Sequence, residues 1–79
     1  MTVRVKLHAI LRKFVPPGAE DHTAVLELPE GATVSDAIAR LGIPAKHAGM
    51  LISGDEYLKP ESKLRDGQEL NVFPPLAGG

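Results

Sequence analysis

The sequence predicts an α+β fold in which a sheet of four or five strands packs on one principal helix. Two observations support this prediction. Segments in which apolar and polar residues alternate, typical of strands with one buried face, occur towards both ends of the chain. Between them, one segment repeats apolar residues at the spacing of an amphipathic helix. Strands whose sheet is covered by a helix on one face form an α+β roll.

The first predicted strand covers residues 2–8, where apolar and polar residues alternate strictly. The residues expected on its buried face are Val3, Val5 and Leu7. Residues 9–15 follow as a short helical turn, which residues 16–18 (Pro-Pro-Gly) end. The apolar residues of this turn, all predicted to point inward, are Ile10, Leu11 and Phe14.

A second alternating segment, residues 22–28, predicts another strand, which ends at the turn formed by residues 29–31 (Pro-Glu-Gly). Its inward residues are expected to be Ala24, Leu26 and Leu28. The segment thus gives the sheet a second strand with one buried face.

The principal helix is predicted to begin after Thr33, which suits the N-cap, with Asp36 completing a capping-box-like pair. Gly42 and Pro44 supply the signals that end the helix. The apolar stripe at positions i, i+3, i+4 and i+7 consists of Val34, Ala37, Ile38 and Leu41. This stripe is expected to pack on one face of the sheet.

Further strands are predicted after the helix, at residues 50–53, 56–58 and 69–73. A turn at Gly54-Asp55 joins the first two, and a polar segment anchored by Leu64 leads onward. The Asp66-Gly67 turn precedes the last strand, whose alternation places Phe73 on the face opposite to the core.

The chain then runs through Pro74, Pro75, Leu76 and Ala77 to Gly78 and Gly79. Two consecutive prolines end a strand, because each lacks the N–H donor and fixes φ. The residues from 74 to 79 reach at most about 20 Å at roughly 3.3–3.6 Å each, and glycine offers the narrowest backbone. We therefore predict a domain at 1–73 and an extended, flexible tail at 74–79, with the terminal carboxylate of Gly79 as the reactive group.

The composition argues against several classes of function. The net charge is −1, and only two Phe and one Tyr are present, so neither a basic surface nor a base-stacking platform for nucleic acid is expected. The absence of cysteine excludes disulfides and thiolate nucleophiles, and it suggests the reducing cytoplasm. No apolar run approaches the roughly 18–20 residues that span a bilayer, so no membrane partner is expected.

Neither a metal site nor a hydrolytic site is predicted. The histidines that lack metal-ligand spacing are His8, His22 and His47. Ser35 and Ser53 have no neighbouring His–Asp arrangement that would make them nucleophiles.

A family resemblance that spans nearly the whole chain is carried by residues 3–7, 11–14, 29–34, 41–44, 64–70 and above all 73–79. With these segments the chain resembles the MoaD/ThiS family of ubiquitin-like sulfur carriers. Its Phe-Pro-Pro segment is more similar to the small subunit of molybdopterin synthase than to the carrier of thiamin thiazole synthesis. The resemblance implies a β-grasp fold, in which a mixed sheet wraps round one helix and the first and last strands are adjacent and parallel.

The resemblance also implies the chemistry of the tail. In the family, a ubiquitin-activating-like adenylyltransferase uses ATP to adenylate the terminal glycine, and a sulfur donor converts the adenylate into a thiocarboxylate. The large catalytic synthase subunit then receives this end. The carrier is a protein co-substrate, monomeric when free and without a bound cofactor. On this chain Gly79 becomes the adenylate and thiocarboxylate site, beside Gly78. The implied partner-binding residues are Phe73, Pro74, Pro75, Leu76 and Ala77.

The residues fit this scheme independently. A carboxylate is a poor electrophile and needs an activated leaving group, yet the chain has no GxxxxGK[ST] phosphate loop, so a partner must bind ATP. Without cysteine, sulfur has no persulfide site and is left with the C-terminus. Other functions stay open: a carrier for thiamin, cysteine or tRNA thiolation, a ubiquitin-like modifier joined to lysines, or an interaction module with an inert tail.

Overall fold

A computed structural model describes residues 1–75 of the chain. Four predicted tail-site residues lie outside the described residues: Leu76, Ala77, Gly78 and Gly79. The strands are β1 (Thr2–Leu7), β2 (Thr23–Glu27), β3 (Met50–Ser53), β4 (Glu56–Tyr57) and β5 (Glu69–Phe73). The helices are α1 (Val34–Arg40) and two 3₁₀ segments, η1 (Ala9–Phe14) and η2 (Ala45–His47).

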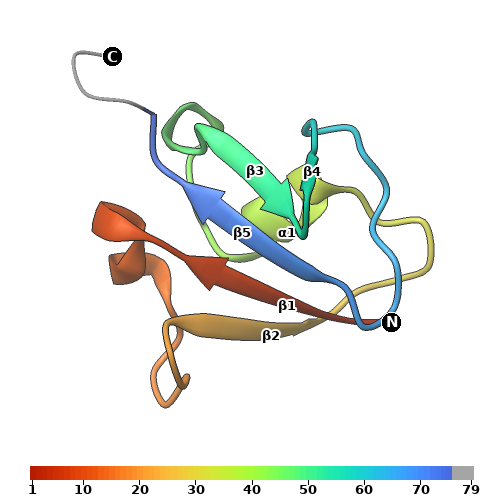
Figure 1. The fold of residues 1–79 in the computed structure, drawn as a ribbon. Helices are drawn as coiled ribbons and strands as arrows, with labels where there is room; N and C mark the ends of the chain where they lie inside the picture. The colour runs from red at the N-terminus through yellow and green to blue at the C-terminus, as the bar shows by residue number, and fades with distance from the viewer. Residues whose placement is uncertain (76–79) are drawn as a thin grey trace.

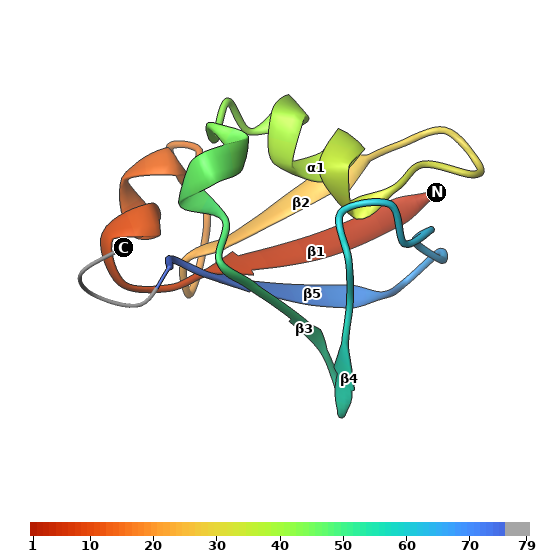
Figure 2. The same cartoon turned by 90° about the horizontal axis from the view of Figure 1, so that it is seen from above.

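The strands form one 5-stranded sheet in the order β2-β1-β5-β3-β4, and α1 crosses one of its faces (Figure 1, Figure 2). The first and last strands are neighbours in the middle of the sheet and run parallel, with Leu7 opposite Val72. β1 pairs antiparallel with β2, and β5 pairs antiparallel with β3. The sheet is therefore mixed, and the predicted α+β architecture is confirmed. Because β1 and β5 run the same way, the end of β1 and the start of the tail meet at one end of the sheet.

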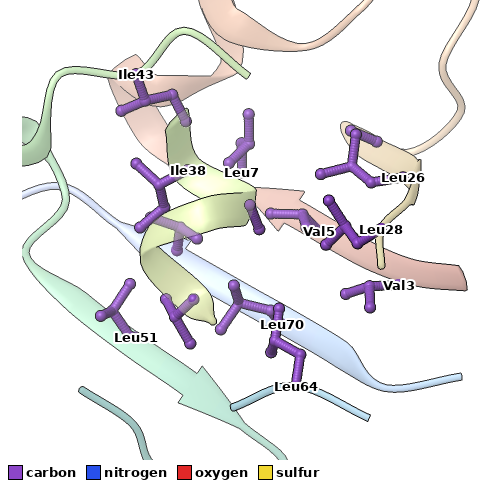
Figure 3. Close-up of a cluster of buried hydrophobic side chains, with 14 of the residues drawn as sticks. Val3, Val5, Leu7, Leu26, Leu28, Ile38, Ile43, Leu51, Leu64 and Leu70 are labelled. Carbon is purple, nitrogen blue, oxygen red and sulfur yellow. The ribbon is translucent and has the colours of Figure 1, made fainter. Parts of the chain in front are cut away.

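The core lies between α1 and the sheet (Figure 3). Each strand of the central pair contributes the side chains that alternation predicted, all of them 0% exposed: Val3, Val5, Leu7, Leu70 and Val72. The helix faces them with Val34, Ala37 and Ile38. Leu64 is buried at the edge of this cluster and anchors the connection that follows β4, as predicted. Within residues 1–75, none of the helices has the length and apolar content to cross a bilayer.

One prediction about the apolar side chains was wrong. Ile10 is 66% exposed, whereas Leu11 is 1% exposed and Phe14 packs partly against the core. The segment is a 3₁₀ helix with three residues per turn, so Leu11 and Phe14 share a face and Ile10 points away from it. Leu41, the C-cap of α1, is half-buried and packs against the core, as the apolar stripe predicted.

The capping box at the start of α1 is confirmed. Thr33 Oγ1 accepts a hydrogen bond from the Asp36 N–H at 3.2 Å, and Asp36 Oδ2 accepts one from the Thr33 N–H at 2.8 Å. Each side chain thus satisfies a backbone N–H that the first turn of a helix leaves without a partner. The box fixes where the helix begins and hence which residues it turns towards the sheet.

Thr33→Ala is expected to lower the free energy of unfolding by about 0.5–2 kcal/mol, because the Asp36 N–H loses its acceptor. Urea unfolding of the two proteins measures the difference. Ser35→Ala, a change at an exposed position in the same turn, is the matched control and should have a smaller effect. Equal losses in the two variants would show that the cap does not stabilise the helix.

Candidate functional site

The face of the sheet that points away from α1 carries a row of apolar side chains next to the start of the tail. Phe73 lies opposite Met50 in the β5–β3 pairing, and Ile52 lies opposite Tyr57 in the β3–β4 pairing. Residues directly opposite each other in antiparallel strands project from the same face. We call Met50, Ile52, Tyr57 and Phe73 the apolar strip. Tyr57 is 75% exposed and Met50 37%, so a partner can reach the strip from solvent.

Phe73 ends β5 and is held by His8, which follows β1. The two rings are stacked, with centroids 4.1 Å apart and planes inclined by 9°. His8 Nε2 donates a hydrogen bond to Asn71 Oδ1 at 2.9 Å, and the His8 backbone N–H donates to Val72 O at 3.1 Å. The histidine is thus fixed on β5 at two points, and its ring supports the aromatic ring at the strand end.

The chain beyond Phe73 lies against Gly49, the residue before β3. The Gly49 N–H donates a hydrogen bond to Phe73 O at 2.7 Å. A Cβ placed on Gly49 would lie 2.7 Å from Pro74 C and 2.5 Å from Pro75 N, closer than real Cβ atoms come to other atoms. The peptide bond between the two prolines therefore lies directly on the glycine. We call Phe73, Pro74 and Pro75 the tail root.

The charged side chains beside the strip come from β1 and are paired. Lys6 Nζ donates a hydrogen bond to Asp21 Oδ2 at 3.0 Å, which lowers the pKa of the Asp21 carboxyl below its ordinary value. Arg4 Nε lies 4.0 Å from Glu69 Oε2. Each of these two cationic side chains of β1 therefore lies near an acidic side chain. Among residues 1–75, no three His, Cys, Asp or Glu side chains gather closely enough to hold a metal ion.

Of the predicted site residues, the structure places Phe73, Pro74 and Pro75 together at the strand end, where the prolines end β5 as expected. Phe73 points away from the core, also as expected, and is half-buried by its neighbours. Sequence reasoning did not single out His8, Gly49 or the strip residues Met50, Ile52 and Tyr57 as parts of the site. Alternation within β3 would have indicated Met50 and Ile52 once the pairing of β3 with β5 was known.

Residues 1–77 match the family described as Mut7-C ubiquitin. The chain belongs to the Mut7-C ubiquitin family. The match covers the domain and most of the predicted tail, and it agrees with the ubiquitin-like fold that the resemblance implied.

Solved structures share the fold of this Mut7-C ubiquitin protein. SAMP1 from Haloferax volcanii has a TM-score of 0.73 and 24% identity, over 100% of both chains. The H. volcanii HVO 2177 protein has a TM-score of 0.75 and 23% identity, over 100% of this chain and 87% of that one. A Pyrococcus furiosus protein provisionally named molybdopterin converting factor, subunit 1, has a TM-score of 0.70 and 26% identity, over 95% of this chain and 98% of its own. The ubiquitin-like β-grasp fold is confirmed, and it is the fold of small carrier and modifier proteins.

Proposed function

We propose that this protein is a sulfur carrier for the biosynthesis of molybdopterin, or of the tungsten analogue tungstopterin. In this proposal the carboxylate of Gly79 is adenylated and then converted to a thiocarboxylate. The observation that carries the proposal is the position of the Pro-Pro-Leu-Ala-Gly-Gly segment. Its first two residues, Pro74 and Pro75, continue directly from the end of β5, beside an exposed apolar strip on which an activating enzyme can dock.

The chemistry assigns the catalytic work to partner proteins. A carboxylate oxygen of Gly79 attacks the α-phosphorus of ATP and releases pyrophosphate, which gives an acyl-adenylate. A sulfur nucleophile from a donor then attacks the carbonyl carbon and expels AMP. The chain has neither a phosphate-binding loop for ATP nor a cysteine to carry sulfur. The protein is therefore a co-substrate, and the adenylyltransferase binds the ATP.

Two partners follow from this scheme. The first is a ubiquitin-activating-like adenylyltransferase, and the second is a large catalytic synthase subunit that takes up the loaded end. The likeness to the P. furiosus protein named molybdopterin converting factor, subunit 1, supports the choice of the molybdopterin pathway. Carriers for thiamin thiazole, cysteine or tRNA thiolation use the same activated carboxylate and differ only in the partner that receives the sulfur.

Intact mass spectrometry of the protein purified from its native cells tests the proposal. We expect part of the population to be heavier by the difference between one sulfur and one oxygen, and tandem spectra to place this sulfur at Gly79. The same measurement establishes whether the mature chain ends at the diglycine, as the chemistry requires. A population that carries no sulfur during active cofactor synthesis would contradict the proposal.

Protein modification is the second candidate, and the likeness to H. volcanii small archaeal modifier protein 1 favours it. A modifier would form an isopeptide bond between the Gly79 carbonyl and a lysine amine. Immunoblots of the same cells would then show a ladder of heavier conjugates, and a carrier alone would show none.

Tyr57→Ala is expected to weaken binding of the activating enzyme about tenfold, because exposed aromatic residues often dominate the binding energy of an interface. The thermal midpoint should barely change, since Tyr57 is 75% exposed in the unbound protein. Calorimetric titration of the enzyme with each variant measures the affinity. Val25→Ala is the matched control, because Val25 is 58% exposed on β2, where it lies opposite Arg4 and away from the strip. Equal losses in both variants would exclude the strip as the docking surface.

A further inference from the structure

Gly49 differs from the other described glycines in the reason why it must be glycine. Gly18, Gly31, Gly42, Gly54 and Gly67 all have a positive φ, and a Cβ added at any of them would meet nothing within 4 Å. Gly49 has no such φ, so its φ does not by itself exclude alanine. What excludes a side chain is the contact with the tail root.

Backbone atoms already occupy the space that a Cβ of residue 49 would need. A Cβ at residue 49 would lie 2.5 Å from Pro75 N, 2.6 Å from Pro75 Cα and 2.7 Å from Pro74 C. Because these are backbone atoms, no change of rotamer can relieve the collision. Any residue other than glycine at position 49 must push the tail root onto a different path or move the start of β3.

Three contacts then define one direction for the tail root. The Gly49 N–H holds Phe73 O at 2.7 Å, the His8 ring stacks on the Phe73 ring, and the Pro74-Pro75 peptide lies on Gly49. Proline fixes φ near −65°, so a direction set at Phe73 is carried through the next two residues with little freedom. Consecutive prolines form an extended, semi-rigid segment.

We propose that Gly49 is a positioning residue, whose missing side chain sets the direction in which the tail leaves the sheet. The effect that we expect Gly49 to have on sulfur loading rests on the proposed function. The direction that Gly49 gives to the tail root does not. If the direction is set before binding, the activating enzyme receives the tail already aimed at its active site. Misplacing a reacting group by about 1 Å can cost up to about a hundredfold in rate, so a displaced tail root should lower kcat. Gly49→Ala removes none of the four side chains of the apolar strip, so the affinity for the enzyme should fall far less than kcat.

Nuclear magnetic resonance of the full-length protein tests the geometry without any partner. We expect a strong Overhauser contact between a Gly49 Hα and the Pro75 Hα, since Pro75 Cα lies next to the empty Cβ position. In Gly49→Ala this contact should be lost and the resonances of Pro74 and Pro75 should shift, with the core resonances retained. Absence of the contact in the unaltered protein would overturn the proposal.

Kinetics with the activating enzyme, ATP and radiolabelled pyrophosphate provide the second test. Gly49→Ala is expected to lower kcat for pyrophosphate exchange about tenfold or more, with KM for the carrier within about twofold. Gly31→Ala is the matched control. Its φ of 86° makes alanine strained, and it lies in the turn between β2 and α1, at the end of the sheet opposite to the tail root (Figure 1, Figure 2). Gly31→Ala should lower the thermal midpoint but leave kcat unchanged below that temperature.

A double variant of the two prolines tests whether the contact between Gly49 and the tail root causes the loss of kcat. In Pro74→Gly/Pro75→Gly the tail root can move aside, so adding Gly49→Ala should cause little further loss of kcat. If Gly49→Ala lowers kcat by the same factor with and without the prolines, the contact is not the cause and the proposal is overturned. Should the unaltered protein fail to undergo exchange with every activating enzyme tried, the proposed function fails, and the Overhauser contact alone decides whether Gly49 directs the tail.

Discussion

Deletion of Gly79 is expected to abolish thiocarboxylate formation and to leave the thermal midpoint of unfolding nearly unchanged. The shortened chain ends on Gly78, so its carboxylate stops one residue short of the position from which the Gly79 carboxylate would attack ATP bound to the activating enzyme. The buried core residues that the structure describes all lie within residues 3–72, and the deletion removes none of them. Mass spectrometry after incubation with the activating enzyme, ATP and a sulfide source measures loading, and calorimetry measures the midpoint.

Gly78→Val provides the companion measurement, because it keeps the chain length and adds a β-branched side chain next to the reacting carbonyl. It should block loading as severely as the deletion if the enzyme admits only a backbone of glycine width. A thermal midpoint that falls strongly in either variant would mean that the end of the chain stabilises the domain. Normal loading of both variants would place the sulfur elsewhere.

Leu70→Ala is expected to cost about 2–5 kcal/mol of unfolding free energy, the usual range for a fully buried leucine. Leu70 is 0% exposed and lies in β5, between β1 and β3. At about 0.05–0.15 kcal/mol per residue, a domain of 79 residues has roughly 4–12 kcal/mol in total, so this single change removes a large share of it. Guanidinium unfolding at constant temperature measures the loss.

Leu41→Ala is the matched control for the core, since it removes the same atoms from a half-buried position at the end of α1. Its loss should be clearly smaller than that of Leu70→Ala. Ile38→Ala, in the buried stripe of the helix, should again fall within about 2–5 kcal/mol. A loss at Leu41 equal to that at Leu70 would mean that burial does not set the cost in this domain.

The sequence was sufficient to predict the five strands, η1 and α1, but not η2. Alternation located β1, β2 and β5, and the box at Thr33 and Asp36 located the start of α1. Ile10 was misplaced because a six-residue segment is too short to distinguish the period of a 3₁₀ helix from that of an α-helix. The parallel pairing of β1 with β5 came only from the family resemblance, since no local pattern specifies which distant strands meet.

Contacts between residues far apart in the chain also explain why His8 and Gly49 were not predicted as parts of the candidate site. His8 meets Asn71 across a separation of 63 residues along the chain, and no spacing in the sequence indicates such a contact. Gly49 follows alanine and precedes a strand, as many glycines do, so its role becomes visible only when the end of β5 is in place beside it. Phe73, Pro74 and Pro75 could be predicted because alternation and proline chemistry are local properties.

The parallel central pair also separates the two ends of the domain. Because β1 and β5 run in the same direction, the first residue lies at one end of the sheet and the last residue of β5 at the other (Figure 1). The amino group of Met1 donates to Leu28 O at 2.7 Å, and a backbone amide at that position keeps an N–H to donate. A fluorescent protein or an affinity tag joined ahead of Met1 is therefore expected to leave sulfur loading unhindered. The same fusion behind Gly79 would occupy the carboxylate itself.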